Sequence, residues 1–420
     1  MIKRKTFSSL FIIIIILTVS FSLEDIQSKI QVKPYRNTFD KQTTKEWTCM
    51  TYCCADTRLS SIQDPQDNSL NKLFLVMYDS LYDLPSRLQT DSETDMNIIV
   101  LFDYPYTQAN PFGDAEIYEV TSSEVNKVAD LGAKNMSSWT VLRDFISYCK
   151  TNYPAYHYSI NLVDHGHGYA GFCYDYHASH PYWDYALGDC LEVSELELAL
   201  SLEGGVDVLF LDTCSGGSFE VAWQLYEEVD YMVAGETVQG YVALCHFVDI
   251  YSQLSHDTSS TPIKLAQIGF NSAKFINYYS LVLDPTHNNV DSWGSVTMYS
   301  LNRFESFTGG PSFKPLFEEL TTELSYELMI NKTTAFELFS NIKGNLTTSG
   351  LSSNSLMVDL YNFLEVVIDF TGQFNNTNIE TKVVQVKNLL EPGPGYIIHD
   401  NWVYSETALP DIHGFSICFP

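Results

Sequence analysis

The sequence predicts an α/β protein whose central sheet is mainly parallel and is covered by helices on both faces. Short apolar segments that are typical of buried strands occur at residues 46–56, 96–104, 156–166, 206–214 and 230–236. Amphipathic patterns typical of helices, such as residues 138–153 and 190–202, lie between them. Strands that alternate with helices form a parallel sheet, because each connection crosses one of its faces.

The composition and a change of pattern in the later part of the chain indicate how the domains are organised. The 420 residues are 45% hydrophobic and 18% charged, which is globular and sufficient for a sizeable core. After about residue 260 the alternation stops: residues 312–343 and 354–371 have helical patterns, and the stretch from Tyr396 mixes short strands with turns. We expect one α/β domain at residues 45–260 and a C-terminal α+β subdomain at residues 261–420.

The N-terminus predicts export. Residues 1–22 combine Lys3, Arg4 and Lys5 with an apolar run and small residues, the pattern of a secretory signal peptide. An uncleaved N-terminal anchor is the competing interpretation, although the run is short for a membrane span. We expect a short propeptide or linker at residues 23–44, and a protein that is secreted or resides in the lumen of the secretory or lysosomal pathway. A glycosylated surface fits the four Asn-X-Ser/Thr sites at Asn135, Asn331, Asn345 and Asn375.

Charge and cysteine content limit the partners. A formal net charge of −29 argues against nucleic acid or an anionic membrane and favours cationic ligands or peptides. In an oxidising compartment eight of the nine cysteines could form disulfides and leave one free thiol, a candidate reactive group. Cys173 and Cys190 are one pair that could close a loop. No two CxxC motifs are present, so we expect no structural zinc site.

Two predicted strands end in residues that can do nucleophilic chemistry. His165 follows one strand in LVDHGHGYAG, and Cys214 follows another in LFLDTCSGG. If these strands are parallel neighbours, their carboxyl ends lie about 4.8 Å apart and bring the two side chains together. A thiol beside an imidazole can attack a carbonyl, and the surrounding glycines allow a substrate to approach the backbone closely.

Other interpretations of these residues remain open. Cys214 could be a packed core thiol or half of a disulfide, and His165 could simply satisfy a backbone carbonyl. His167 could act as the base instead of His165. The two histidines could also bind a metal, with His177 or His180 as a third ligand, although we expect no metal site.

Five segments in order carry a resemblance to a known family. They are WTCMTYCCAD at 47–56, the histidine block at 152–171, the cysteine block at 212–236, MVDLYNFLEVV at 357–367 and HGFSICFP at 413–420. In these segments the chain resembles the clostripain family of cysteine peptidases, within the caspase-like group. The resemblance spans most of the mature chain and implies a caspase-like (caspase-haemoglobinase) sandwich for the domain at 45–260.

The resemblance also implies roles for individual residues. Cys214 would be the nucleophile, His165 the general base and acid, and the N–H groups of Gly166 and Cys214 the oxyanion donors. Asp212 would help to form an acidic pocket for Arg or Lys before the scissile bond, although a strand-end acid can equally bond a neighbouring amide. The family's second pocket acid has no clear match in residues 237–249, and CSGG departs from the more apolar residues usual after this cysteine.

We therefore expect a secreted, monomeric cysteine endopeptidase that acts on peptide or protein substrates and prefers Arg or Lys before the cut. The alternatives are a legumain-like or transamidase-like enzyme of this fold with another specificity, and a catalytically silent binding protein. No cofactor is expected to be required; the acidic stretch 79–95 is a candidate calcium site or, more simply, a solvated acidic loop. No Lys or Arg occurs from Thr151 to Pro262, so self-cleavage after a basic residue between His165 and Cys214 is not expected.

Overall fold

A computed structural model provides the structure of the chain. It describes residues 44–55, 72–89, 95–104, 114–175, 189–237, 239, 246–283, 294–305, 312–345, 357–403 and 412–418. The expected signal peptide, and all of the expected propeptide or linker except residue 44, lie outside these ranges. Within the described ranges, no helix combines the length and the apolar character that crossing a membrane requires.

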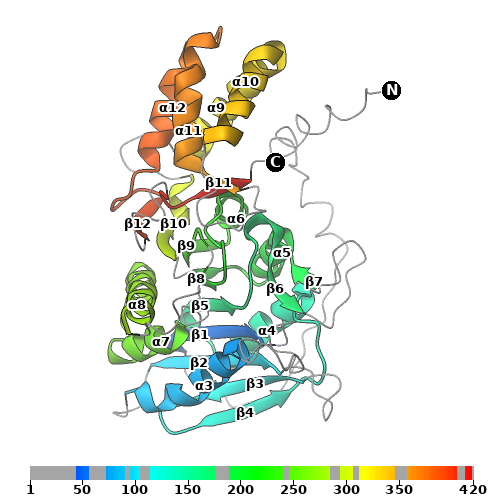
Figure 1. The fold of residues 1–420 in the computed structure, drawn as a ribbon. Helices are drawn as coiled ribbons and strands as arrows, with labels where there is room; N and C mark the ends of the chain where they lie inside the picture. Colours follow the sequence, from blue (N-terminus) through cyan, green and yellow to red (C-terminus); the bar gives the residue numbers. More distant parts are fainter. Residues whose placement is uncertain are drawn as a thin grey trace.

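A nine-stranded sheet forms the centre of the described chain, in the order β12-β10-β9-β8-β5-β1-β2-β3-β4 (Figure 1). The five central strands pair in parallel: β9 (Val229–Ala234), β8 (Val206–Asp212), β5 (Ala155–Val163), β1 (Lys45–Cys54) and β2 (Met96–Asp103). All five coincide with predicted strands. Parallel strands are buried on both faces, so they occur in the sequence as continuous apolar runs.

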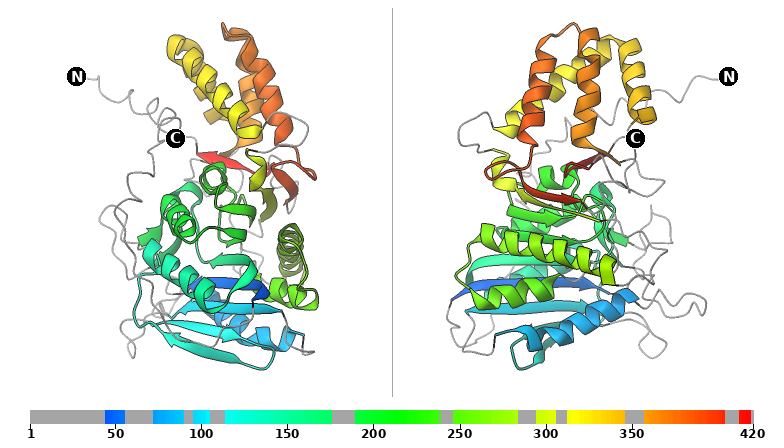
Figure 2. Two further views of the ribbon diagram at one scale, coloured as in Figure 1. Left: turned by 180° about the vertical axis from the view of Figure 1, so that it is seen from behind. Right: turned by 60° about the vertical axis from the view of Figure 1, so that its left-hand side comes forward.

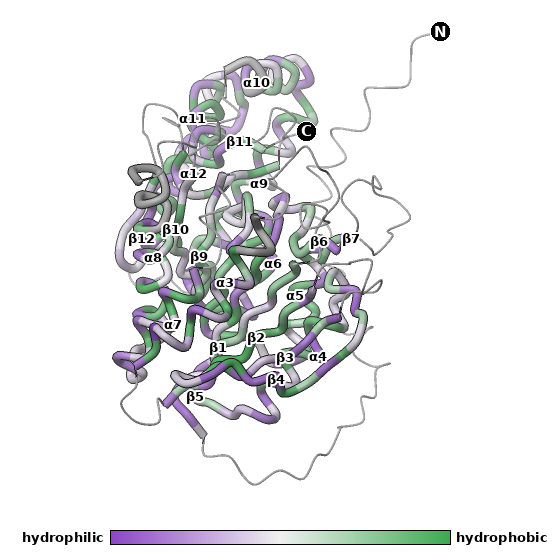
Figure 3. The backbone as a smooth tube through the Cα atoms, turned by 60° about the horizontal axis from the view of Figure 1, so that its bottom comes forward, coloured by the Kyte–Doolittle hydropathy of each residue, from purple (hydrophilic) through white to green (hydrophobic). Residues whose placement is uncertain are grey.

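Antiparallel strands complete both edges of this sheet. They are β3 (Ala115–Val120) and β4 (Val125–Asp130) at one edge, and β10 (Ser295–Ser300) and β12 (Ile398–Val403) at the other. The sequence analysis did not predict β3, β4 and β10, whereas β12 lies in the stretch from Tyr396 where short strands were expected. Strand β4, with the sequence VNKVAD, has no buried residue, and it therefore lacks the apolar run that marks a central strand. Figure 3 shows hydrophobic residues following the central strands of the sheet.

Helices cover both faces of the sheet, as predicted. One face packs against α4 (Trp139–Asn152), α5 (Val193–Leu202) and α6 (Phe219–Leu225), and the other against α3 (Lys72–Arg87), α7 (Phe247–His256) and α8 (Pro262–Leu283) (Figures 1 and 2). In α4 the buried residues recur at helical spacing, at Leu142, Phe145, Ile146 and Cys149. The sheet is therefore the middle layer of a three-layer sandwich.

Residues beyond 260 complete the sheet and also form a group of helices. Helix α8 and strands β10 and β12 belong to the sandwich, whereas α9 (Phe313–Ile330), α10 (Lys332–Asn345), α11 (Leu360–Phe370) and α12 (Asn378–Leu389) stand together at one end (Figure 1). Two small sheets, β6 (Phe172–Asp175) with β7 (Asp189–Leu191) and β11 (Met357–Asp359) with β13 (Ser416–Cys418), lie outside the main one. Single turns of 3-10 helix occur at Gly168–Ala170, Leu301–Arg303 and Thr371–Gln373.

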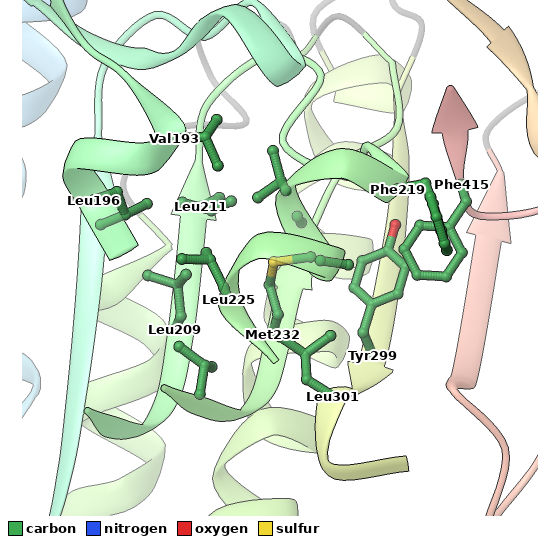
Figure 4. Packing of buried hydrophobic residues seen from close by; sticks show 14 of the residues in the cluster. Val193, Leu196, Leu209, Leu211, Phe219, Leu225, Met232, Tyr299, Leu301 and Phe415 are labelled. Atoms are coloured by element: carbon green, nitrogen blue, oxygen red, sulfur yellow. The ribbon is translucent and has the colours of Figure 1, made fainter. Parts of the chain in front are cut away.

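Phe219 joins the helical group to the sandwich. Its ring, at the start of α6, lies 4.7 Å from that of Phe317 in α9 and 5.7 Å from that of Phe415 near the C-terminus. Figure 4 shows Phe219 beside Phe415 and Tyr299, with the apolar side chains of α5, β8 and β9 alongside. Because α6 begins only five residues after Cys214, this packing helps to position the segment that carries the predicted nucleophile.

The acidic stretch expected as a loop is partly helical. Residues 79–87 belong to α3, where Asp83 forms an ion pair with Arg87 one turn later. The solvated-loop interpretation is therefore wrong for this part of the stretch, because Val76, Met77, Leu81 and Leu84 give the segment an apolar face that packs against the sheet. Residues 90–94 lie outside the described ranges.

Candidate active site

Strands β5 and β8 bring the predicted histidine and cysteine to the same edge of the sheet. The two strands are parallel neighbours, with Val163 paired to Asp212, and the Asp164 N–H donates to the Asp212 carbonyl at 3.3 Å. His165 follows the end of β5 by two residues, and Cys214 follows the end of β8 by two residues. The chain order reverses between β1 and β5, next to these strands, and the carboxyl ends of strands near such a point are where α/β proteins bind ligands.

Gly166 fits directly against the backbone of Cys214. A Cβ on Gly166 would lie 2.5 Å from the carbonyl oxygen of Cys214 and 2.8 Å from the Cβ of Thr213. Gly166 also forms a β-bridge with Phe172, flanked by a 3.0 Å bond from the His167 N–H to the Gly171 carbonyl. Only glycine allows this close approach of the two loops.

The loop after Cys214 is held in an unusual conformation by residues from distant parts of the chain. Ser215 has a φ of 55°, a left-handed conformation that non-glycine residues rarely adopt, and its N–H donates to the Thr237 carbonyl at 3.0 Å. Gly217 donates to the Gly235 carbonyl at 2.8 Å and accepts from the Ser416 N–H at 3.2 Å. The C-terminal strand β13 thus supports the turn that carries Cys214.

The thiol of Cys214 lies against the backbone of one residue. The Gln239 N–H donates to the sulfur at 3.3 Å, and the thiol is 3.7 Å from the Gln239 carbonyl oxygen, which can accept from it. Burial raises the pKa of Cys214, and the bond from Gln239 opposes this only in part. The resting thiol is therefore protonated at neutral pH and needs a base to become a nucleophile.

His165 has the protonation state that a base requires. Burial, and to a smaller degree the neighbouring His167, lower the pKa of His165 to about 4. The imidazole is therefore neutral at any pH well above 4, and its buried Nε2 has no hydrogen-bond partner within the described residues. A neutral imidazole beside a protonated thiol can accept the proton when the thiol attacks.

We expect iodoacetamide to modify Cys214 slowly at pH 7 and increasingly fast up to and beyond pH 9. Only the thiolate reacts, and a raised pKa moves its formation to higher pH. Most other described cysteines are fully enclosed, and burial raises the pKa of Cys49 and Cys190 to about 12. Peptide mapping of labelled protein checks the site, and rates from pH 6 to 10 check the trend. Finding Cys214 in a disulfide in active protein would rule out its role as nucleophile.

The carboxylate of Asp212 is engaged within the protein. Its Oδ2 accepts from the Asn161 side chain and from the His246 N–H, both at 2.9 Å, and its Oδ1 bonds the His246 Nδ1. Only 5% of Asp212 is exposed. These contacts are those of a strand-end acid that bonds neighbouring amides, the simpler of the two interpretations of Asp212.

A small hollow adjoins this group and the thiol. Gln239, which touches Cys214, and His246, which bonds Asp212, both line it. The other lining residues come from β8, β9, the segment after β9, α8 and the start of β10: Leu211, Asp212, Val233, Ala234, Gly235, Ala273, Ser295 and Val296. Polar and apolar residues both line the hollow, and Gln239 connects it to Cys214.

The remaining predictions about these side chains have different outcomes. His167 is exposed and packs edge-on against Tyr174, with ring centroids 5.0 Å apart, so it lies farther into the loop than His165. Within the described residues no group of three His, Cys, Asp or Glu side chains could hold a metal, and His177 and His180 lie outside those residues. The expected disulfides are absent among the eight described cysteines: Cys190 bonds the Ala170 carbonyl instead of Cys173.

Sequence reasoning missed three residues of this site: Asn161, Gln239 and His246. Asn161 is inside β5 and is indistinguishable in the sequence from any polar residue in an apolar run. Gln239 and His246 belong to residues 237–249, where the resemblance led us to look for a second pocket acid. A search for acids alone passes over His246, and Asp249 pairs with Arg87 instead.

A cysteine and a histidine at the carboxyl ends of adjacent parallel strands, in a sheet flanked by helices, define the caspase-like class of cysteine peptidases. A model of the clostripain family (Peptidase_C11) matches residues 67–392 of the chain. The chain belongs to the clostripain family.

Individual relatives agree with this assignment. The clostripain of Hathewaya histolytica is 26% identical over 217 residues, which cover 46% of this chain and 38% of that protein, so the match spans less than half of either. A secreted C11 cysteine protease of Bacteroides thetaiotaomicron, solved with an irreversible peptide inhibitor, is 15% identical with a TM-score of 0.52 over 89% of this chain and 88% of that one. An inactive zymogen C11 protease of Parabacteroides distasonis is 17% identical with a TM-score of 0.56, over 91% and 94%. The predicted caspase-like fold is confirmed.

Proposed function

We propose that the protein is a secreted cysteine endopeptidase that uses Cys214 and His165 to hydrolyse peptide bonds. The observation that supports the proposal is the parallel pairing of β5 and β8, since a neutral imidazole and a protonated thiol each follow the carboxyl end of one of these neighbouring strands. Support for export comes from the signal-like residues 1–22 and from the relative that is described as secreted. We further propose that it acts as a monomer, without a required cofactor.

The proposed reaction follows from the protonation states of the two groups. His165 accepts the thiol proton as the sulfur of Cys214 attacks the scissile carbonyl carbon, and the negative charge moves to the carbonyl oxygen. The N–H groups of Gly166 and Cys214 stabilise that oxyanion. His165 then donates its proton to the leaving amine as the C–N bond breaks, and it later activates a water molecule that hydrolyses the thioester.

We also propose that Arg or Lys is preferred before the scissile bond. Asp212 lies two residues before Cys214 and borders the hollow that Gln239 connects to the thiol. The anionic carboxylate and the net charge of −29 both favour a cationic side chain there.

A peptide library profiled under reducing conditions tests the function. We expect cleavage after Arg or Lys, no cleavage by Cys214→Ala, and a fall of about tenfold or more in kcat/KM on basic substrates for Asp212→Asn, because the pocket loses its charge while the side chain keeps its shape. Glu305→Gln, which changes an exposed carboxylate in the same way, is the matched control. Cleavage without a basic preference would reject this specificity and favour a legumain-like enzyme; no cleavage of any peptide would reject the function.

A further inference from the structure

Glu236 is a fully buried acid that the proposed reaction does not use. It lies two residues beyond the end of β9 with none of its surface exposed, and its Oε2 accepts from the Gly414 N–H at 2.9 Å. Its Oε1 is buried as well, and within the described residues it accepts from no N–H group or hydroxyl. A charged oxygen in this position would cost free energy, which favours the protonated form of the acid.

A second buried acid, Asp359, faces Glu236. Asp359 is 2% exposed, and its side chain is hydrogen-bonded to that of Glu236. Burial, and then the negative charge of Asp359, raise the pKa of Glu236 well above its ordinary value. Two ionised carboxylates are acceptors only and cannot bond each other, so the pair contains a proton.

The other contacts of Asp359 assign that proton to Glu236. Asp359 caps the N-terminus of α11 by accepting from the Asn362 N–H at 2.9 Å. It also accepts from the His413 N–H at 2.7 Å, and the His413 Nδ1 is 3.2 Å away. Such donors, and the positive end of a helix, stabilise a carboxylate. Among the described residues Glu236 has one N–H donor, that of Gly414, so Asp359 keeps the charge and Glu236 keeps the proton.

Tyr299 and His413 are the other titratable groups at this pair. Burial raises the pKa of Tyr299, in β10, well above its usual value, and its neutral hydroxyl donates to the Gly414 carbonyl. His413 contacts Asp359 and stacks on Tyr361 of α11, with ring centroids 4.5 Å apart. The charge that acts on the Glu236 carboxyl is therefore that of Asp359.

The residues on either side of Glu236 hold the turn that follows the candidate nucleophile. The Thr237 carbonyl accepts from the Ser215 N–H at 3.0 Å. The Gly235 carbonyl accepts from the Gly217 N–H at 2.8 Å. The side chain of Glu236 thus connects the segment that supports this turn to α11 and to the segment at 412–418.

We propose that Glu236, in its protonated form, is a positioning residue for Cys214: the proton that it shares with Asp359 joins residues 235–237, and with them the turn after Cys214, to α11 and to the segment at 412–418. This inference rests on the proposed function, in which Cys214 is the nucleophile. Loss of the proton would leave two negative charges side by side in a buried site, and the connection would open.

The shared proton predicts how stability depends on pH. Glu236 is ionised in the unfolded chain above about pH 4.5 and stays neutral in the folded protein. Its contribution to stability is therefore complete below about pH 4.5, and it falls as the pH rises toward the folded-state pKa, by about tenfold in the unfolding equilibrium constant per pH unit. Glu236→Gln, which keeps the shape and can donate to Asp359, removes this dependence.

Thermal unfolding of wild type and Glu236→Gln from pH 5 to 8 tests the shared proton. We expect the two Tm values to agree within about 2 °C at pH 5, and the variant to gain about 1 to 2 °C over wild type for each further pH unit. Asp359, His413 and Tyr299 are common to both proteins, so the comparison isolates Glu236. A Tm difference that stays constant from pH 5 to 8 overturns the shared proton.

Steady-state kinetics near neutral pH, well below the Tm of each protein, test the positioning role. We expect Glu236→Ala to lower kcat about tenfold or more with little change in KM, and Glu236→Gln to restore kcat to within about threefold of wild type. The rate of iodoacetamide labelling of Cys214 should change in the Ala variant and not in the Gln variant. Glu327→Gln is the matched control: this buried glutamate of α9 accepts from the Asn375 N–H at 3.1 Å, and the variant should match wild type.

The outcomes separate this inference from the proposed function. If wild type cleaves peptides and Glu236→Gln loses as much kcat as Glu236→Ala, or if neither variant loses any, the positioning role is overturned and the function stands. If wild type cleaves no peptide, the function fails, and the pH dependence of Tm and the labelling of Cys214 still decide the inference. Glu236→Asp, whose carboxyl is one methylene farther from Asp359, replaces Glu236→Ala if that variant does not fold.

Discussion

Replacing His165 with alanine should lower kcat by about 10²- to 10⁴-fold, the usual contribution of a positioned general acid–base. The loss should be this large because the Cys214 thiol is protonated at rest and depends on the imidazole to remove its proton. His167→Ala should cost less than about tenfold, since this side chain is exposed and lies two residues farther from the end of β5 than His165. The measurement is kcat and KM of each variant on the best library peptide.

His157→Ala adds a matched control on the same strand. This histidine bonds Asp207 at 2.9 Å near the opposite end of β5, so its loss tests whether removing any histidine from the strand reduces activity. Thermal unfolding of all three variants monitors the fold. A greater loss of kcat in His167→Ala than in His165→Ala would indicate that His167, and not His165, is the general base.

Replacing Gly166 with alanine should lower kcat/KM by about 10²-fold or more. The added methyl carbon would lie 2.5 Å from the Cys214 carbonyl oxygen and 2.9 Å from the Phe172 ring, so the two loops must separate. A displacement of about 1 Å at reacting groups can cost 10²-fold, and loss of one oxyanion donor about 10²- to 10³-fold. Steady-state kinetics give the effect, and labelling of Cys214 reports whether the thiol remains accessible.

Gly372→Ala is the control for this substitution. A Cβ at Gly372 would have nothing within 4 Å, so the same chemical change there should leave both activity and stability nearly unaltered. If Gly166→Ala keeps wild-type kcat/KM, the two loops accommodate the added methyl group without displacing the reacting groups, and the close fit of Gly166 does not limit activity.

The sequence predicted the buried parts of the fold well and the edges poorly. Strands β1, β2, β5, β8 and β9 are apolar runs, because both of their faces are covered and nearly every residue must be hydrophobic. The strands β3, β4 and β10, which were not predicted, contain polar residues and lack a long apolar run. Their local sequences do not distinguish them from loops.

The acidic stretch at residues 79–95 is a second case in which the local sequence did not reveal the structure, here a helix. Residues 79–87 contain enough Asp and Ser to resemble a loop, yet Leu81 and Leu84 pack against the sheet and Asp83 pairs with Arg87. Burial of the apolar face outweighs the weak local preference of the polar residues.

The sequence by itself identified His165 and Cys214 as the candidate reactive residues, and the strands that they follow, because a strand-end His-Gly and a strand-end Asp-X-Cys are local patterns. Only the tertiary structure decided what surrounds them. The pairing of Asp212 with His246 joins residues 34 positions apart, and the support of Gly217 by Ser416 joins residues almost 200 positions apart. Contacts at such separations depend on how the strands and the C-terminal segment pack, and hydrogen bonds of this kind leave no periodic signal along the chain.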